Sequence, residues 1–506
     1  LQQVDVGDAG GSIATANLTG TGIGVRVAHN DDDPVYPVPP VSGSTLAVEG
    51  NTAAATAAGN VSSLGVGFTA GGSGEIPGGV VVANVQTVQA DSSLIEATTS
   101  DTQISVSTAV LAPVLAPVSG STLMVRGNTV GATAVANDGA AVIASDGLLS
   151  ASGSTGDPSA TITGAPADVS DASLSATADY LISNLQRSRS VGAKASVDAT
   201  TISTLAGLTN GTAAVEENRV EATAIGNSFV GALSNLRPES NTSQALASQQ
   251  FAADSPVSAS VENTTIRVGN GSDAEFSGST LSVSGNRVTA TGTVNSASLS
   301  ATGVAPVGVG AGATNGASTE ITADGSGSLT TKVGGSVVVA NSQMLSDGAH
   351  VASVTGTAVQ VADTGDPGLT NGTAQVNLNT VSATITGNLA TASAELGAGG
   401  ASSYGGGVVV ANAQNAEAAI FTATNSGTML GITAVNAVDG STLTVGGNSV
   451  GASATANRAT HTLTGSGVVT AGGPGGLAPA VSINGSEPLN VSGAGYLSAN
   501  VQRTNA

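Results

Sequence analysis

The 506-residue chain contains no cysteine and no tryptophan, and it has only 5 phenylalanines and 4 tyrosines. Without cysteine, neither a disulfide framework nor a thiolate metal site can form. Aromatic residues make up 2% of the chain, so the large side chains that fill a thick globular core are scarce. The 70 glycines and an apolar content rich in valine and alanine instead favour a thin interior.

Positive charge is also scarce, because 12 Lys and Arg face 34 Asp and Glu, which gives a net charge of −22. A nucleic-acid partner is excluded, since binding a phosphate backbone requires a basic face. No apolar run approaches the length of a membrane span, and we expect no membrane insertion. Hydrophobic residues reach 40% and charged residues only 9%, unlike the composition of disordered chains. We therefore expect the chain to be ordered, through repetition.

Internal repetition is the strongest feature of the sequence. The string Gly-Ser-Thr-Leu-x-Val-x-Gly-Asn begins at Gly43, Gly120, Gly278 and Gly440. Its final asparagine starts a pair, Asn-x8-Asn, that occurs six times. The pairs are Asn51/Asn60, Asn128/Asn137, Asn218/Asn227, Asn286/Asn295, Asn379/Asn388 and Asn448/Asn457. Subtracting successive first members gives steps of 77, 90, 68, 93 and 69 residues.

Alternate units share additional strings, so the larger period is about two steps long. The string Gly-Leu-Thr-Asn-Gly-Thr at 207–212, for example, recurs at 368–373. We expect one continuous array over residues 1–506. Its predicted parts are a partial repeat at 1–42 and three repeats at 43–206, 207–367 and 368–506.

Between the asparagines, residues alternate with a period of two, as in Val130–Ala136 and Val381–Thr386. Valine and threonine favour strands, and small residues on one face suit a tight interior. Asparagine and glycine best tolerate positive φ, so all twelve paired asparagines are predicted to be structural corners that stack in ladders. The predicted fold is all-β, a parallel β-helix (β-solenoid) built from tandem repeats. With about 20–27 residues per coil, it would form a rod about 90–120 Å long.

These features resemble the secreted parallel β-helix proteins of bacterial surfaces, such as adhesins, autotransporter passengers and matrix fibres. The resemblance covers the whole chain but is architectural. It implies an extracellular, structural role at the cell surface and carries over no catalytic residue.

Candidate chemical sites are few. Asp31, Asp32 and Asp33 form one acidic loop, and Asp363 with Asp366 forms the corresponding loop; close carboxylates could bind calcium, although a solvated turn is the favoured explanation. No other cofactor is expected. The three histidines, His29, His350 and His461, are predicted to be solvent-facing, and no catalytic motif is present. We therefore expect no enzymatic activity.

The sequence favours an extracellular structural protein, a subunit of a surface or matrix filament with an adhesive role. The strings near the two ends predict head-to-tail stacking of identical chains, because the landmark at 499–502 is internal to the repeat and residues 18–34 resemble 354–367. Surface glycans are a second expected partner. One alternative is a carbohydrate-active β-helix enzyme of the lyase or tailspike type, which the lack of tryptophan disfavours. Another is an ice- or mineral-binding adhesin using Thr-x-Thr rows, whose rows do not recur once per predicted coil.

Overall fold

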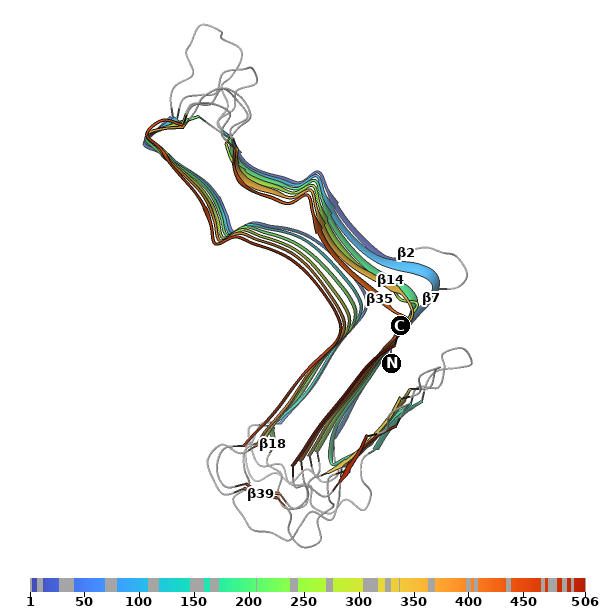
Figure 1. The fold of residues 1–506 in the computed structure, drawn as a ribbon. Coiled ribbons are helices and arrows are strands. Elements are labelled where there is room, and N and C mark those ends of the chain that lie inside the picture. Colours follow the sequence, from blue (N-terminus) through green and yellow to red (C-terminus); the bar gives the residue numbers. More distant parts are fainter. Residues whose placement is uncertain are drawn as a thin grey trace.

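The structure, a computed structural model, describes residues 2–6, 12–26, 41–68, 80–107, 118–145, 159–163, 173–205, 207–236, 244–269, 276–303, 317–323, 329–335, 337–362, 369–396, 402–404, 408–433, 438–465, 469–471, 480–484, 489–492 and 496–505. These residues form strands, turns and bends and no helix. The strands pair in parallel in stacked sheets, which confirms the predicted parallel β-solenoid. Figure 1, which looks along the stack, shows that each coil is flat and bent.

The outer sheet, with eleven strands, forms one long wall of the solenoid. Two of its strands, β7 (Val80–Ser100) and β14 (Tyr180–Asp198), run the length of this wall, whereas other coils contribute two shorter strands. The shorter strands form four pairs, with β42 as a single strand in the last layer. They are β1 (Gln2–Val6), β2 (Ser12–Thr19), β19 (Gln244–Ala253), β20 (Val257–Glu262), β27 (Val337–Ser346), β28 (Ala349–Thr355), β34 (Val408–Glu417), β35 (Ile420–Ser426) and β42 (Tyr496–Asn505).

The inner sheet is the opposite wall and contributes one long strand per coil. Its register is in phase over almost the whole length, so equivalent residues of successive coils form columns. The strands are β6 (Thr52–Phe68), β11 (Thr129–Ser145), β18 (Arg219–Leu236), β24 (Arg287–Gly303), β32 (Thr380–Leu396) and β38 (Ser449–Gly465).

In each coil, the chain passes from the outer wall to the inner wall through strands of three narrower sheets. The first consists of β3 (Gly22–Arg26), β8 (Gln103–Ser107), β15 (Thr201–Leu205), β21 (Thr265–Val268), β29 (Ala358–Ala362) and β36 (Met429–Thr433). The second consists of β4 (Val41–Ser42), β9 (Val118–Ser119), β16 (Leu208–Thr209), β22 (Phe276–Ser277) and β30 (Leu369–Thr370). The third consists of β5 (Thr45–Glu49), β10 (Thr122–Arg126), β17 (Thr212–Glu216), β23 (Thr280–Ser284), β31 (Thr373–Asn377) and β37 (Thr442–Gly446).

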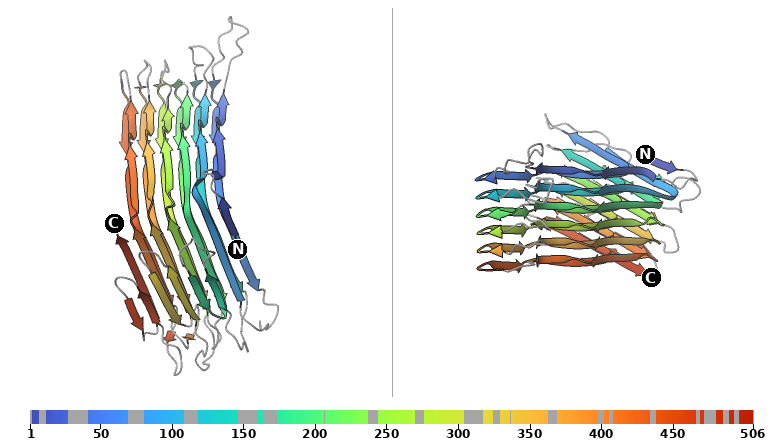
Figure 2. Two further views of the ribbon diagram at one scale, coloured as in Figure 1. Left: turned by 90° about the vertical axis from the view of Figure 1, so that its right-hand side faces the viewer. Right: turned by 90° about the horizontal axis from the view of Figure 1, so that it is seen from above.

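The chain thus makes six coils, and their colours succeed one another along the stack in Figure 2. Coil 1 comprises β1–β6, coil 2 β7–β11, coil 3 β14–β18, coil 4 β19–β24, coil 5 β27–β32 and coil 6 β34–β38, and β42 starts a seventh layer. Equivalent asparagines of neighbouring coils are 77, 90, 68, 93 and 69 residues apart.

Each sequence step is therefore one coil, and the prediction of 20–27 residues per coil is wrong. Asn-x8-Asn does not mark one short strand between two corners, because both asparagines belong to the same wall of a much wider coil. Seven layers about 4.8 Å apart give a stack only about 30 Å tall, not 90–120 Å.

The two-step period has a structural counterpart in a separate antiparallel sheet, the hairpin sheet. Its hairpins are β12 (Ser159–Thr163) with β13 (Ser173–Thr177), β25 (Ala317–Ala323) with β26 (Leu329–Gly335), and β40 (Ala480–Asn484) with β41 (Leu489–Ser492). One hairpin precedes β14, one β27 and one β42, so every second coil carries one. A hairpin has two strands and therefore spans two layers, which explains why the units alternate. A small pair, β33 (Ser402–Tyr404) with β39 (Val469–Ala471), lies apart. The boundaries of the three larger repeats stay a prediction.

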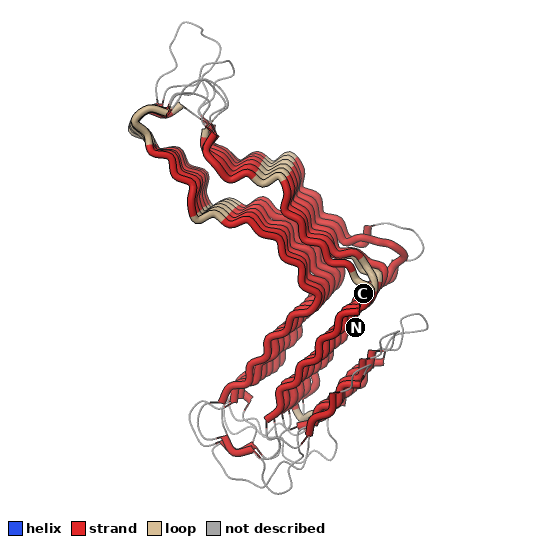
Figure 3. The backbone as a smooth tube through the Cα atoms, viewed as in Figure 1, coloured by secondary structure: helices blue, strands red, loops and turns tan. Residues whose placement is uncertain are grey.

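The long inner strands bend midway, as the tube in Figure 3 shows. In β11 the paired register stops at Val135 and resumes at Asn137, and both Ala136 and Asn137 are buried. Two consecutive inward residues reverse the alternation, as in a β-bulge, and this bends the wall. The first of these positions alternates between glycine and a larger residue: Gly59, Ala136, Gly226, Val294, Gly387 and Ala456.

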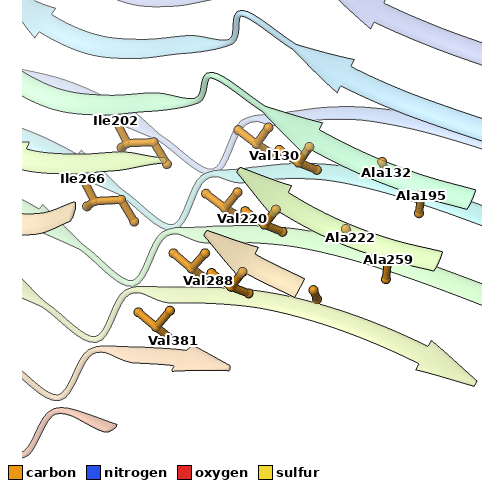
Figure 4. Close-up of a cluster of buried hydrophobic side chains, with 14 of the residues drawn as sticks. Val130, Ala132, Ala195, Ile202, Val220, Ala222, Ala259, Ile266, Val288 and Val381 are labelled. Carbon is orange, nitrogen blue, oxygen red and sulfur yellow. The ribbon is translucent and has the colours of Figure 1, made fainter. Parts of the chain in front are cut away.

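The core lies between the two walls and contains mainly valine, alanine, isoleucine and leucine. Figure 4 shows its columnar order, with Val130, Val220, Val288 and Val381 one above another in successive coils. Small side chains suffice because the walls of so flat a coil lie about 10 Å apart. A second cluster, with Leu174 and Ala176 of the hairpin sheet, covers the far face of the outer sheet.

Candidate functional site

The first notable feature is a ladder of asparagines at the turn before each inner strand; its four interior members are buried and its two end members are half-buried. Each Nδ2 donates a hydrogen bond of 2.9–3.0 Å to Oδ1 of the asparagine in the next coil, and the backbone N–H donates to the same oxygen. From Asn128 onward, Nδ2 also donates to a valine carbonyl of the preceding coil. The ladder comprises Asn51, Asn128, Asn218, Asn286, Asn379 and Asn448.

The positive φ at this turn belongs to the residue before the asparagine. That residue is Gly50, Gly127, Glu217, Gly285, Leu378 or Gly447, with φ between 56° and 66°. The ladder asparagines are not among the residues with positive φ, so hydrogen bonding along the stack, and not tolerance of a left-handed backbone, accounts for their presence here.

The second asparagine of each pair forms a parallel ladder at the bend of the inner wall. Its Nδ2–Oδ1 distances are 2.7–2.9 Å. Each Nδ2 also donates to a backbone carbonyl of the outer wall, as Asn137 does to Arg187 at 2.8 Å, so the ladder joins the two walls. The members are Asn60, Asn137, Asn227, Asn295, Asn388 and Asn457.

A glutamine ladder in the outer wall, which the sequence analysis missed, runs in the opposite direction. From Gln186 onward, each Nε2 donates to Oε1 of the preceding coil at 2.6–2.8 Å. From Gln86 to Gln414, each Nε2 also donates to a carbonyl of the inner wall. The recurrence of Asn-x-Gln would have revealed it in five of the six layers, and Gln250 follows Ser248 in the remaining one. The ladder comprises Gln86, Gln186, Gln250, Gln343, Gln414 and Gln502.

The core columns end differently in the first and last coils. In the column of β5, Val48 is 5% exposed, Val376 is fully buried and Val445 is 52% exposed. Val450 of coil 6 is likewise 52% exposed, whereas its counterpart Ala53 in coil 1 is 4% exposed. Coil 1 has only coil 2 beside it among the described coils; its Val48, Ala53, Ala55 and Ala57 are buried, whereas Leu46, Leu64 and Val66 are partly buried. Coil 6 is therefore less well covered than coil 1, and among the described strands only β42, which pairs with β34, follows it.

The hydrogen-bond ladders have matching polarity at these two edges. Asn51 Oδ1 accepts no hydrogen bond from the described residues, although every later member of its ladder does. At the other edge, the backbone N–H of Asn448 donates to no described side chain, and its Nδ2 donates only to Val376. One edge of the stack thus presents acceptors where the other presents donors.

The predicted calcium sites cannot be located in the described part of the chain. Asp31, Asp32, Asp33, Asp363 and Asp366 lie outside them, as does His29. Within the described ranges, no three histidine, aspartate or glutamate side chains gather closely enough to hold a metal ion. No helix in the described part of the chain has the length and apolarity of a membrane span.

The prediction that the histidines face solvent is wrong for His350, which is fully buried. Its ring stacks on Phe421 with centroids 5.2 Å apart, and its Nδ1 accepts a hydrogen bond from the Val257 N–H at 3.2 Å. Burial lowers the pKa of His350 to about 4, so the ring is neutral at pH 7. His461 is half-buried in the inner sheet, and burial lowers its pKa as well. His350 therefore has a packing role.

The chain matches no protein-family model, no curated protein and no solved structure. The two edges of the coil stack, where the ladders and the core columns end, are therefore its candidate functional surfaces.

Proposed function

We propose that this protein is a structural subunit of an extracellular filament, in which identical chains stack head to tail along the solenoid axis. The observation that carries the proposal is the half-exposed core of coil 6, where Val445 and Val450 end columns that are covered in all earlier coils. Coil 1 of a second copy has the same cross-section and the same columns, so it supplies the missing layer in register. Covering exposed apolar side chains then drives association.

The polarity of the asparagine ladders supports the head-to-tail arrangement. In such a stack the donors of Asn448 meet the free Oδ1 of Asn51, and the ladder continues through the junction. A two-fold dimer of two coil-6 edges would instead place donors against donors. The contact is heterologous and does not close on itself, which is the condition for an open filament.

The position of strand β42 supports one particular layer for the entry of the second copy. It covers β34 but leaves the remaining strands of coil 6 open, so coil 1 of the next copy belongs in the layer that β42 starts. In that layer β42 takes the place of β1, because Gln502 is equivalent to Gln2 through the column of Gln86 and Gln414. The shared coil therefore combines β42 of one copy with β2–β6 of the next, and β1 is displaced.

The extracellular and adhesive parts of the proposal rest on composition and on architectural resemblance. Only 12 of 506 residues are lysine or arginine, which leaves few sites for trypsin-like proteases. The outward faces of the stacked strands present many serine and threonine hydroxyls in columns, for example Thr133, Thr223, Thr291 and Thr384 on the inner sheet. Such a surface suits hydrogen bonding to surface glycans.

Electron microscopy and sedimentation of the purified chain over a concentration series test the proposal. We expect filaments with an axial repeat of about 29 Å, which is six layers of about 4.8 Å. A chain that stays monomeric up to about 1 mM, or that forms only closed dimers, would overturn it.

A further inference from the structure

We propose that the hairpin sheet is also continuous through the filament, with β41 of one copy pairing antiparallel with β12 of the next. This inference rests on the proposed stacking but concerns a different surface. β12 and β41 are the two edge strands of the hairpin sheet, and each has an unpaired side within the described chain. Unpaired strand edges readily accept a further strand.

In the hairpin sheet, paired residues of all six strands lie in one straight row across the sheet. Thr161 pairs with Ser175, Ser175 with Glu320, Glu320 with Lys332, Lys332 with Ser482, and Ser482 with Asn490. The pairs within a hairpin and the pairs between hairpins lie in the same line. A following hairpin in the same line places Thr161 of the next copy opposite Asn490.

The strand directions also fit. The sheet is antiparallel throughout, so its six strands alternate in direction and β41 runs opposite to β12. A new β12 placed beside β41 therefore continues the alternation without a reversal.

The solenoid and the hairpin sheet advance by the same distance along the axis from one copy to the next. The solenoid advances by six layers from one copy to the next, because coil 1 of the next copy shares the layer of β42. The hairpin sheet contains six strands at a similar spacing, so it advances by the same distance and leaves neither a gap nor an overlap at the junction. Stacking on a separate eighth layer would leave the hairpin sheet one strand short.

The hairpin sheet would thus act as a second contact, beside the coil edge, that fixes the junction. Leu174 and Ala176 of β13 are buried against Leu181 and Leu185 of the outer sheet, so the sheet is held to the solenoid and its edge is held at a fixed position relative to coil 6. The hairpins precede layers three, five and seven, so they occur at every second layer. The hairpin sheet therefore continues without a gap only if coil 1 of the next copy enters at an odd-numbered layer, and the layer of β42 is the seventh.

Disulfide formation tests the pairing directly, because the chain has no cysteine of its own. In the double variant Thr161→Cys/Asn490→Cys the two thiols within one chain are five strand spacings, about 24 Å, apart and cannot bond. Oxidation of assembled protein should yield a ladder of covalent multimers on a non-reducing gel. Each single variant should give at most dimers. The variant Thr161→Cys/Ser492→Cys, displaced by two residues along the strand, should bond poorly, because diagonal neighbours lie about 7–8 Å apart.

A second cysteine pair separates this inference from the stacking itself. Thr52→Cys/Ser449→Cys joins coil 1 to coil 6 through the inner sheet, where both residues are exposed and share one column. Multimers from both pairs support the continuous hairpin sheet. Multimers from Thr52/Ser449 alone would overturn the hairpin inference and leave the filament standing, and multimers from neither would overturn both.

Discussion

Val376 and Val445 face each other in adjacent coils of one core column, yet Val376 is fully buried and Val445 is 52% exposed. The two residues share chemistry and position, and they differ only in whether another coil follows. Burial in this molecule is therefore a property of the stack, and the coil edge is where its interactions are incomplete.

Charge at the open core should prevent stacking. We expect Val445→Lys and Val450→Lys each to raise the concentration needed for assembly at least tenfold, because an ammonium group would be buried in the new layer. The matched control is Val230→Lys, at a residue 49% exposed on the outward face of β18 in coil 3. Sedimentation compares the three variants at equal concentration. Unchanged assembly of both edge variants would contradict the proposed contact.

Removing β1 should favour assembly. If β42 of one copy replaces β1 of the next, deletion of residues 1–6 removes a competitor for the same place on β7. Light scattering should show a shorter lag phase and a lower critical concentration than for the full chain. Slower assembly after the deletion would mean that β1 contributes to the junction, contrary to the shared-coil arrangement.

The interior of the asparagine ladder should be sensitive to substitution. Asn218→Ala leaves the N–H and Nδ2 of Asn128 without their acceptor, and the carbonyl of Val125 without its donor. Leaving buried polar groups unsatisfied costs about 1–3 kcal/mol each, so we expect a clear fall in the urea midpoint. Asn51→Ala, at the end of the ladder, is the control and should cost less, because only its own donors are lost. An equal fall in the urea midpoint for both variants would show that the interior hydrogen bonds of the ladder contribute no more to stability than those at its end.

His350 should make stability depend on pH. Its pKa is lowered to about 4 by burial, against about 6.5 in the unfolded chain, so stability is fully present above pH 6.5. As the pH falls through this window the unfolded state takes up the proton first, and the loss reaches about 3 kcal/mol below pH 4. Thermal unfolding at pH 7 and pH 4.5 measures the effect. His350→Gln should shift less between these pH values than the natural chain, and an equal shift would exclude His350 as its source.

The glycines that alternate with larger residues at the bend of the inner wall should not tolerate a side chain. A Cβ at Gly226 would approach the carbonyl oxygen of Val294 in the next coil to 2.5 Å, whereas a Cβ at Gly65 meets nothing within 4 Å. We expect Gly226→Ala to destabilise the fold by about 1–3 kcal/mol through overpacking, and Gly65→Ala to change little. Urea unfolding of both variants checks this. A neutral Gly226→Ala would mean that the wall shifts to admit the methyl group.

Much of the fold followed from the sequence. The period-two pattern around Val130 and Val381 predicted strands, and the recurring asparagines predicted in-register stacking, because neither feature depends on distant residues. The candidate site was harder. That Val445 and Val450 are exposed depends on which layer follows them, and no local pattern distinguishes them from the buried valines of earlier coils. The burial of His350 likewise depends on Phe421 in the next coil, 71 residues away in sequence.

The sequence by itself determined that strands repeat and that their asparagines lie one above another, because identical strings fold alike and parallel stacking aligns equivalent residues. It left undecided how many residues make one coil. Only the tertiary structure decided that each repeat closes a single flat coil of two long walls and that every second coil adds a hairpin. These choices depend on which distant strands pair, and hydrogen bonding between strands 68–93 residues apart is set by the packing of the whole layer, not by the strands alone.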